Sequence, residues 1–176
     1  MEKIIKIPSD INVILSNFKV SVKGKLGELE RDFFSPLFAK QIILESFDNK
    51  IILKTDSKKR KIKSMVGCIE SHIKNMFKGV TDGFTYKLKI VYMHFPVTVK
   101  VSGDKILISN FLGEKTPRKS KIVGNCKVEV KGDDVIVSGT DKELAGQTAA
   151  NIERACAIKG YDRRVFQDAI VIVEKP

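Results

Sequence analysis

The side chains in this sequence that are best placed to do chemistry are lysines and arginines, which gather in three groups. The groups are Lys58, Lys59, Arg60, Lys61 and Lys63; Lys115, Arg118, Lys119 and Lys121; and Arg154, Lys159, Arg163 and Arg164. Clustered cations bind a polyanion because each phosphate that they neutralise releases condensed counterions. Gly113 and Pro117 mark the second group as an irregular loop, which can approach an RNA backbone closely. The pattern predicts phosphate contacts that depend on RNA shape and backbone.

The first and third groups also have a structural interpretation. Lys58–Lys63 crowds the start of a predicted helix, where positive charge opposes the helix dipole, so a solvated polar face is the alternative to a phosphate patch. Arg154–Arg164 surrounds the end of another predicted helix, where cations complement the dipole. The residues alone leave both interpretations open.

No catalytic constellation accompanies these cations. The sequence has no GxxxxGK[ST], GxGxxG or GxSxG pattern, and its acidic residues are scattered rather than paired. His72 and His94 stand alone, and a lone histidine is more often packed or solvated than a catalytic base. The three cysteines, Cys68, Cys126 and Cys156, lack the CxxC spacing of a zinc site. We therefore expect no enzyme, no metal site and no cofactor.

Composition points to a basic, well-packed protein. The chain has 176 residues, 43% of them hydrophobic, and a formal net charge of +11. The hydrophobic fraction is enough for a core, and the charge favours a polyanionic partner. No apolar run approaches the roughly 18 residues that cross a membrane, no signal peptide is evident, and few cysteines suit a reducing compartment. We expect a cytoplasmic protein with no membrane partner.

The pattern of elements occurs twice along the chain. Predicted strands near residues 50–54 and 134–138 each precede an amphipathic helix, and each helix is expected to stop at a Lys-Gly pair, at Gly79 and at Gly160. Hairpin-like strand pairs precede these elements, and strands at 86–92 and 168–173 follow them. Thr140–Glu143 has the pattern of a capping box for the second helix.

This repeat predicts an α+β fold of two tandem duplicated modules, each an antiparallel sheet packed against one helix. The expected boundary lies near Tyr92–Phe95, which gives modules of residues 1–93 and 94–176. Charge favours RNA binding by the first half, since residues 1–94 hold 18 Lys and Arg against 10 Asp and Glu, whereas residues 95–176 hold 14 against 11. Local clustering without intervening acids favours the loop Lys115–Lys121 of the second half.

Several segments resemble one known family. They are Gly139–Glu153, Arg163–Asp168 with the final Glu174 and Lys175, Asn110–Lys115, Ile7–Pro8 and Val22–Gly27. Together they resemble the universal large-subunit ribosomal protein six family, called protein nine in eukaryotes, and Asn110–Lys115 is similar to its archaeal and eukaryotic branch. The resemblance spans the chain and implies a duplicated α+β fold, in agreement with the repeat.

The resemblance implies a structural role in the large ribosomal subunit, with binding to large-subunit rRNA near the sarcin–ricin loop and the translation-factor site. It also implies neighbouring large-subunit proteins as partners, translation factors nearby, and a second module that carries most rRNA contacts. Carried over to this chain, it adds Asn151, Phe166 and Asp168 to the basic candidates. Two positions depart from the family pattern, because Ala169 stands where glycine is usual and Val171 where tyrosine is usual.

Two other functions compete with this interpretation. One is a basic module that binds some other nucleic acid, and the other is an RNA-processing enzyme built on a duplicated scaffold. The enzyme would need a cluster of acid–base or metal-binding groups, which the sequence lacks.

Overall fold

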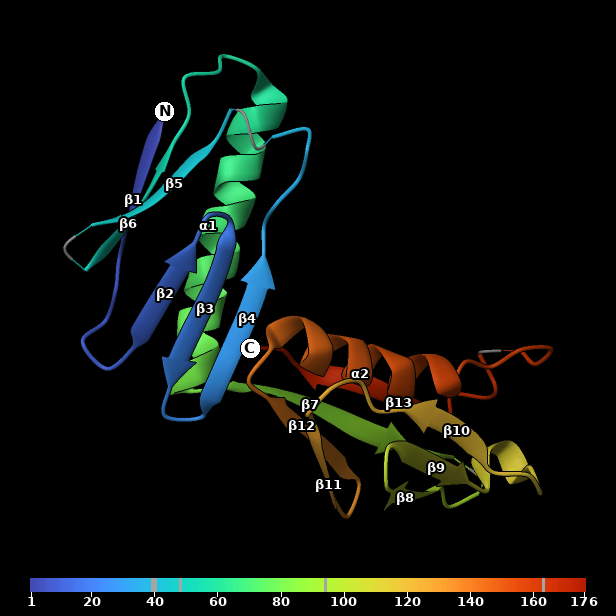
Figure 1. Ribbon diagram of the computed structural model, residues 1–176. Helices are drawn as coiled ribbons and strands as arrows, with labels where there is room; N and C mark the ends of the chain where they lie inside the picture. Colours follow the sequence, from blue (N-terminus) through green and yellow to red (C-terminus); the bar gives the residue numbers. More distant parts are fainter. Residues whose placement is uncertain (39–40, 48, 94, 163) are drawn as a thin grey trace. The chain divides into compact units, whose positions relative to one another are not determined.

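The computed structural model describes residues 1–38, 41–47, 49–93, 95–162 and 164–176, and it divides into two modules. The first module is Met1–Gly83 and the second is Phe84–Pro176. Figure 1 shows the long helix of the first module and the shorter helix of the second, each beside short strands. Every strand pair in both modules is antiparallel.

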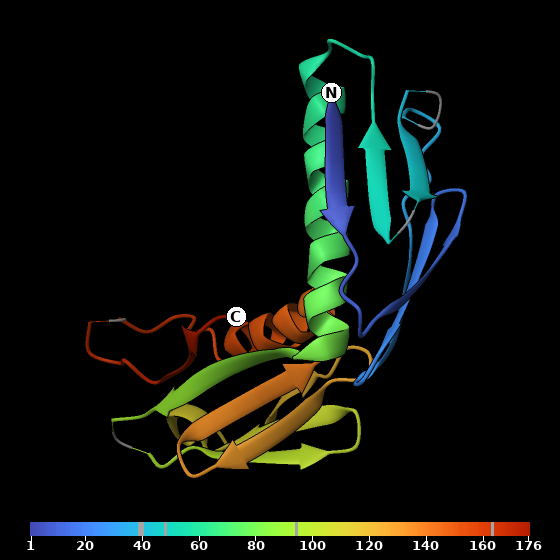
Figure 2. The ribbon, with the colours of Figure 1, turned by 90° about the vertical axis from the view of Figure 1, so that its left-hand side faces the viewer.

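The first module contains two three-stranded sheets and one long helix. Its elements are β1 (Glu2–Lys6), β2 (Asn12–Ser16), β3 (Lys19–Gly24), β4 (Gly27–Asp32), β5 (Ile43–Phe47), β6 (Lys50–Lys54) and α1 (Arg60–Thr81). The strand orders are β1-β6-β5 and β2-β3-β4. Figure 2 shows α1 running alongside both sheets, and it packs on β1, β3, β4 and β6. The core lies between the helix and the inner faces of the sheets.

The second module repeats this plan and adds a strand. Its elements are β7 (Phe84–Val91), β8 (Thr98–Ser102), β9 (Lys105–Ser109), the short 3-10 helix η1 (Phe111–Gly113), β10 (Arg118–Lys121), β11 (Lys127–Lys131), β12 (Asp134–Gly139), α2 (Lys142–Ala155) and β13 (Ala169–Glu174). The sheets have the orders β10-β9-β8 and β11-β12-β7-β13. Helix α2 packs on β7, β10, β12 and β13 and closes a separate core.

The predicted α+β duplication is confirmed, and the strands of each module form two sheets rather than one. Strand β7 lies beside β12 in the second module just as β1 lies beside β6 in the first. The repeating unit is therefore six strands followed by a helix, and β13 is a strand that the described part of the first module lacks.

The structure divides the chain ten residues before the predicted boundary at 93/94. The sequence pattern assigns the strand at 86–92 to the end of the first module, but β7 pairs with β12 on one side and with β13 on the other. The physical reason is its alternating pattern: Phe84, Tyr86, Leu88 and Ile90 are all buried, and all but Phe84 are assigned to the second core. A strand belongs to the core that buries its apolar face.

Both helix ends differ from the prediction. Helix α1 continues past Gly79 to Thr81 and ends where Gly83, with φ of 76°, donates its N–H to the Lys78 carbonyl. Helix α2 ends at Ala155, before the Lys-Gly pair at Gly160. Its N-cap is Asp141 rather than the predicted threonine, since the Asp141 carboxylate accepts from the Glu143 N–H at 2.8 Å.

Candidate nucleic-acid interface

Strand β10 separates the basic residues of the second group into two sets. Successive side chains of a strand point to opposite faces, so Arg118 and Ser120 face α2 while Lys119 and Lys121 point outward. Ser120 is buried, and both lysines are exposed. Lys115 is also exposed, in the turn that precedes the strand. The predicted loop thus offers three cations to a partner and turns the fourth inward.

Arg118 is occupied by its own module. Its Nε and Nη2 donate to the Glu114 carboxylate at 2.9 and 2.6 Å, and its Nη1 donates to the main-chain carbonyls of Ala155 and Ala157, each at 3.0 Å. The guanidinium also lies 4.3 Å from the ring centre of Phe111. The hydrogen bond from Arg118 holds the pKa of Glu114 below its ordinary value, and the bond to Glu114 raises the pKa of Arg118. These bonds give Arg118 a positioning role within the module, and its contact with phosphate stays a prediction.

The turn before β10 is built to present Glu114 to Arg118. Asn110 and Leu112 adopt left-handed conformations with φ of 61° and 52°, and Gly113 follows with φ of 74°. A left-handed conformation is sterically unfavourable for leucine but not for glycine, so contacts with the surrounding residues have to stabilise this turn. Phe111 supplies such contacts, because only 1% of it is exposed. The family-like segment Asn110–Lys115 is therefore largely structural, apart from its exposed lysine.

Two polar side chains of α2 tie the helix to the end of β10. Asn151 Nδ2 donates to the Lys121 carbonyl at 3.2 Å, and its Oδ1 accepts from Gln147 at 2.8 Å. Thr148, which is fully buried, accepts from the Val123 N–H at 3.0 Å. Asn151, predicted as an rRNA contact, is thus placed to fix the main chain that carries Lys121, and it is half-buried itself.

The segment after α2 carries exposed cations beside an aromatic pair. Arg154, Lys159 and Arg164 are all exposed. Phe166 is half-buried and lies against Tyr161, with 5.0 Å between ring centres, and 54% of Tyr161 is exposed. Cations beside an exposed aromatic ring suit a phosphate next to an unstacked base. Arg163, also predicted here, lies outside the described residues.

Asp168 lies inside the module. Its residue is only 1% exposed, and its Oδ1 accepts from the Met93 N–H at 2.7 Å. Asp168 thus links the start of β13 to the chain after β7, and its contact with rRNA stays a prediction. The adjacent Ala169 starts β13 in regular register with Val91 and has no positive φ, so this fold does not need glycine there. Val171 is partly exposed on the outer side of the same strand.

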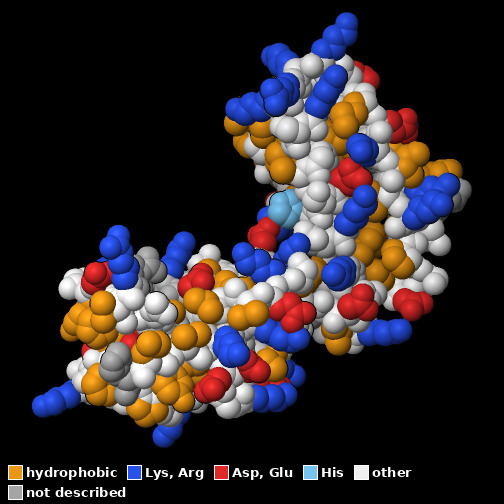
Figure 3. Space-filling model, turned by 180° about the vertical axis from the view of Figure 1, so that it is seen from behind, with side chains coloured by type: hydrophobic (Ala, Val, Ile, Leu, Met, Phe, Trp, Pro, Cys, Tyr) orange, Lys and Arg blue, Asp and Glu red, His pale blue; other side chains and the backbone are white. Residues whose placement is uncertain are grey.

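The first basic group surrounds the start of α1. Lys58, Lys59, Arg60, Lys61 and Lys63 are all exposed. The helix has no side-chain N-cap and no acid in its first turn, so nothing there offsets the unfavourable dipole. Figure 3 shows lysine and arginine side chains gathered at this end of the first module.

The charge difference between the halves nearly disappears when the structural modules are counted. Residues 1–83 hold 16 Lys and Arg against 10 Asp and Glu, and residues 84–176 hold 16 against 11. The shift arises because Lys87 and Lys89 lie on β7 and so belong to the second module. Net charge therefore no longer favours the first module as the RNA-binding module, and the two modules have to be compared by how their basic side chains are arranged.

The described residues offer no catalytic or metal-binding alternative. Among them no group of three His, Cys, Asp or Glu side chains could hold a metal ion. Burial raises the pKa of the Cys156 thiol to about 12, which leaves it protonated and unreactive. His72 lies near the Phe33 ring, with 6.2 Å between ring centres, and His94 lies outside the described residues.

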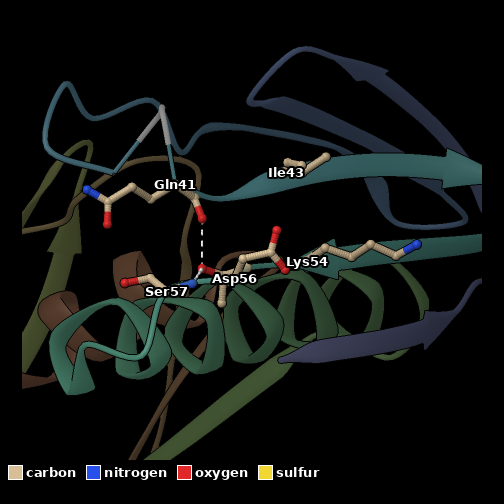
Figure 4. A pocket seen from close by; sticks show the side chains of 6 residues that line it. Gln41, Ile43, Lys54, Asp56 and Ser57 are labelled. Atoms are coloured by element: carbon tan, nitrogen blue, oxygen red, sulfur yellow. Dashed lines mark hydrogen bonds between the residues drawn. The ribbon is translucent and has the colours of Figure 1, made fainter.

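A pocket of about 300 Å³ in the first module also lacks catalytic groups (Figure 4). It is lined by Gln41, Ile43, Lys54, Thr55, Asp56 and Ser57. The Thr55 hydroxyl donates to the Gln41 carbonyl at 2.7 Å and accepts from the Ser57 N–H at 3.3 Å, so it holds the loop together. Asp56 is the one carboxylate in this lining, and Lys54 is paired with Glu2 at 3.4 Å, so the lining shows no carboxylate pair or histidine for acid–base work.

Comparison with known proteins agrees with the duplicated architecture. The model of the ribosomal protein L6 family matches the chain twice, over residues 7–83 and 95–169. The large ribosomal subunit protein uL6 of Sulfurisphaera tokodaii is 53% identical over 97% of this chain and 90% of its own length. The uL6 of Methanobrevibacter smithii is 48% identical over 97% of this chain and 94% of its own length.

The chain belongs to the ribosomal protein L6 family. The resemblance found from the sequence motifs is thereby confirmed. Proteins of the L6 family are structural ribosomal proteins rather than enzymes, and so is this chain. The described residues form no helix that is long and apolar enough to cross a membrane.

Sequence reasoning overlooked three exposed residues of this L6-family chain. Lys100 on β8 and Lys105 on β9 are exposed, and so is Tyr161 beside Phe166. The two lysines are isolated in sequence, and only the pairing of β8, β9 and β10 relates them to Lys119 and Lys121. A hairpin register drawn across the turn at residues 103–104 is the signal that finds them.

Proposed function

We propose that this chain is a constituent of the large ribosomal subunit in the cytoplasm and binds large-subunit rRNA, chiefly through its second module. The proposed position is near the sarcin–ricin loop and the translation-factor site, beside other large-subunit proteins and with translation factors nearby. Membership of the L6 family and the names of its relatives support the assignment to the large subunit. The finer position rests on the resemblance.

The second module is favoured as the rRNA-binding module because the side chains around β10 have two different roles. Lys115, Lys119 and Lys121 project outward, while Arg118 and Asn151 fasten the same segment to α2. A phosphate site needs exposed cations on a main chain that does not move when they bind, because ordering the site would cost affinity. Arg154, Lys159, Arg164 and the Tyr161–Phe166 pair form a second proposed contact at the carboxyl end of α2.

The first module offers the rival site. Its cluster at the start of α1 is as dense, but long side chains on an exposed helical turn remain hydrated and lose rotamer freedom when they bind. The main chain of this cluster is held by local bonds, such as that from the Lys59 N–H to the Ser57 hydroxyl at 3.3 Å, and α1 has no side-chain cap. We therefore assign the main contact to the second module.

The test compares two matched variants of the full chain. One replaces Lys115, Lys119 and Lys121 with alanine, and the other replaces Lys58, Lys59 and Lys61. Binding to a large-subunit rRNA transcript is measured at several salt concentrations, and the sarcin–ricin region is footprinted. We expect the first variant to lower the slope of log K against log salt by about 2–3, at roughly 0.7–0.9 per lost phosphate contact, and to weaken the footprint.

We expect the second variant to change the slope little and to keep the footprint. The opposite pattern would assign the rRNA site to the first module and overturn the proposal. Failure of the unaltered chain to co-sediment with large subunits would remove the ribosomal assignment altogether.

A further inference from the structure

The outer face of the sheet β10-β9-β8 is lined by lysines from all three strands. The register places Lys121 opposite Lys105, and Lys119 and Lys100 on either side of Leu107. All four lysines are exposed, whereas Ile106 and Ile108, which alternate with Lys105 and Leu107, are fully buried on the other side. The remaining outward residues are Thr98, Ser102 and Ser109, so this fully described face holds no acid.

Two other sheet faces of the molecule pair lysines with acids, and the outer face of β1-β6-β5, where Lys6 lies opposite Lys50, also carries Glu2 and Glu45. In the first module, β3 lies beside the acidic β4, and Lys23 bonds to Glu28 at 3.0 Å. In the second module, the outer face of β11-β12-β7-β13 pairs Lys131 with Glu129 at 3.1 Å and Lys87 with Glu174 at 2.5 Å. Pairs of opposite charge such as these stabilise a sheet without any partner molecule.

Lys105 and Lys121 meet as a directly opposed cross-strand pair. Like charges in this position destabilise a sheet, because their Cβ atoms lie only about 4.5–5.5 Å apart. Two more lysines on the same face add to the repulsion. A partner that brings negative charge to this face removes that repulsion. The lysines that repel one another in the free protein would therefore each contribute an attraction in the complex.

We propose that this lysine face, defined by Lys100, Lys105, Lys119 and Lys121, is a docking surface for the phosphate backbone of RNA. The inference rests on the proposed function and extends its site from one strand to three. The face carries no aromatic side chain on which a base could stack, and its lysines are point charges without fixed hydrogen-bond geometry. It therefore engages phosphates rather than bases.

The face is distinct from the contact at the end of α2. Lys119 and Lys121 point away from the side of β10 on which Arg118 reaches the α2 carbonyls. The second module therefore has two proposed contact surfaces on opposite sides of β10. An RNA that engages both has to pass around the edge of this strand.

The test uses two doubly substituted full-length chains with the same loss of charge. Lys100→Ala with Lys105→Ala removes the two lysines on β8 and β9, and the control Lys87→Ala with Lys89→Ala removes two from the charge-balanced face. Each is titrated with a large-subunit rRNA transcript across a salt series. We expect the first to lower the slope of log K against log salt by about 1.5, and the control to leave it unchanged.

A third variant, Lys105→Glu, separates binding from folding. It sets an acid opposite Lys121, so we expect a melting temperature equal to or a few degrees above that of the unaltered chain. We expect the same substitution to weaken rRNA binding. If the substitutions at Lys100 and Lys105 leave slope and affinity unchanged while the unaltered chain binds, the inference fails alone. If the unaltered chain binds the transcript no better than an unrelated RNA, the proposed function fails first.

Discussion

Replacing Arg118 should lower the stability of the second module rather than remove a direct contact with RNA. Arg118→Ala removes a bidentate pair with Glu114, whose side chain is 39% exposed, so solvent limits that loss to about 0–1 kcal/mol. The two bonds to the carbonyls of Ala155 and Ala157 contribute about 0.5–1.5 kcal/mol each, and the contact with Phe111 about 0.5–2 kcal/mol. The sum is a loss of roughly 1.5–6 kcal/mol, and each kcal/mol lowers the melting temperature by about 4–8 °C for a module of this size.

Arg118→Lys provides the discriminating comparison. It keeps the positive charge but loses the planar fork that bonds Glu114 and the carbonyls together, so we expect it to lose at least half as much stability as the alanine variant. A phosphate contact, by contrast, would survive the change to lysine. Lys119→Ala on the same strand is the matched control, with stability within about 0.5 kcal/mol of the unaltered chain and a salt slope lower by about 0.7–0.9.

The measurements are thermal unfolding followed by circular dichroism, and rRNA titrations at temperatures where each variant is folded. The positioning role would be refuted if Arg118→Ala melted like the unaltered chain while its salt slope fell by about 1. In that case Arg118 would be a phosphate contact, as the sequence alone predicts.

Three further predictions follow from the same structure. The fragment of residues 84–176 should fold by itself, whereas the fragment 94–176 should give the NMR spectrum of an unfolded chain because it lacks β7. If both fragments folded, the module boundary between Gly83 and Phe84 would be contradicted. Gly24→Ala should destabilise the first module by about 1–3 kcal/mol in urea unfolding, because its Cβ would lie 2.6 Å from a Val80 methyl of α1. Gly67→Ala, in open space within α1, should instead stabilise it by up to about 1 kcal/mol. The bond from Arg118 holds the pKa of Glu114 below its ordinary value of 4.5, so the stability that the ionised carboxylate contributes should be complete above pH 4.5 and lost as the pH falls further. The urea midpoints of Glu114→Gln and of the unaltered chain should therefore differ above pH 4.5 and converge at lower pH. A difference that stayed constant with pH would contradict the pairing.

Much of the fold follows from sequence periodicity. The apolar stripe that predicts the first helix is the buried face of α1, from Ile62 to Val80. The strands near residues 50 and 134 are β6 and β12, and their similar surroundings reveal the duplication. These features are predictable because each depends on neighbours within one element.

The module boundary and the roles of the basic residues depend on contacts between distant segments. Nothing local in β7 says whether its buried face joins the core before or after it in the chain. Arg118 resembles its lysine neighbours in sequence, yet its partners Ala155 and Ala157 lie at and just after the end of α2, 37 and 39 residues further along the chain. The lysine face likewise exists only through the register of three strands, two of which contribute a single outward lysine.

The place of β13 in its sheet bears on how the protein is made. All elements of the first module lie within the first 83 residues, so that module can fold while synthesis continues. In the second module, β7 is made early, but one of its two partners is β13, which follows only after α2. Completion of this sheet has to wait until β13 has been made, and such distant pairing slows folding. A chain interrupted before β13 would therefore have an unfinished second module even though all elements of its first module were present.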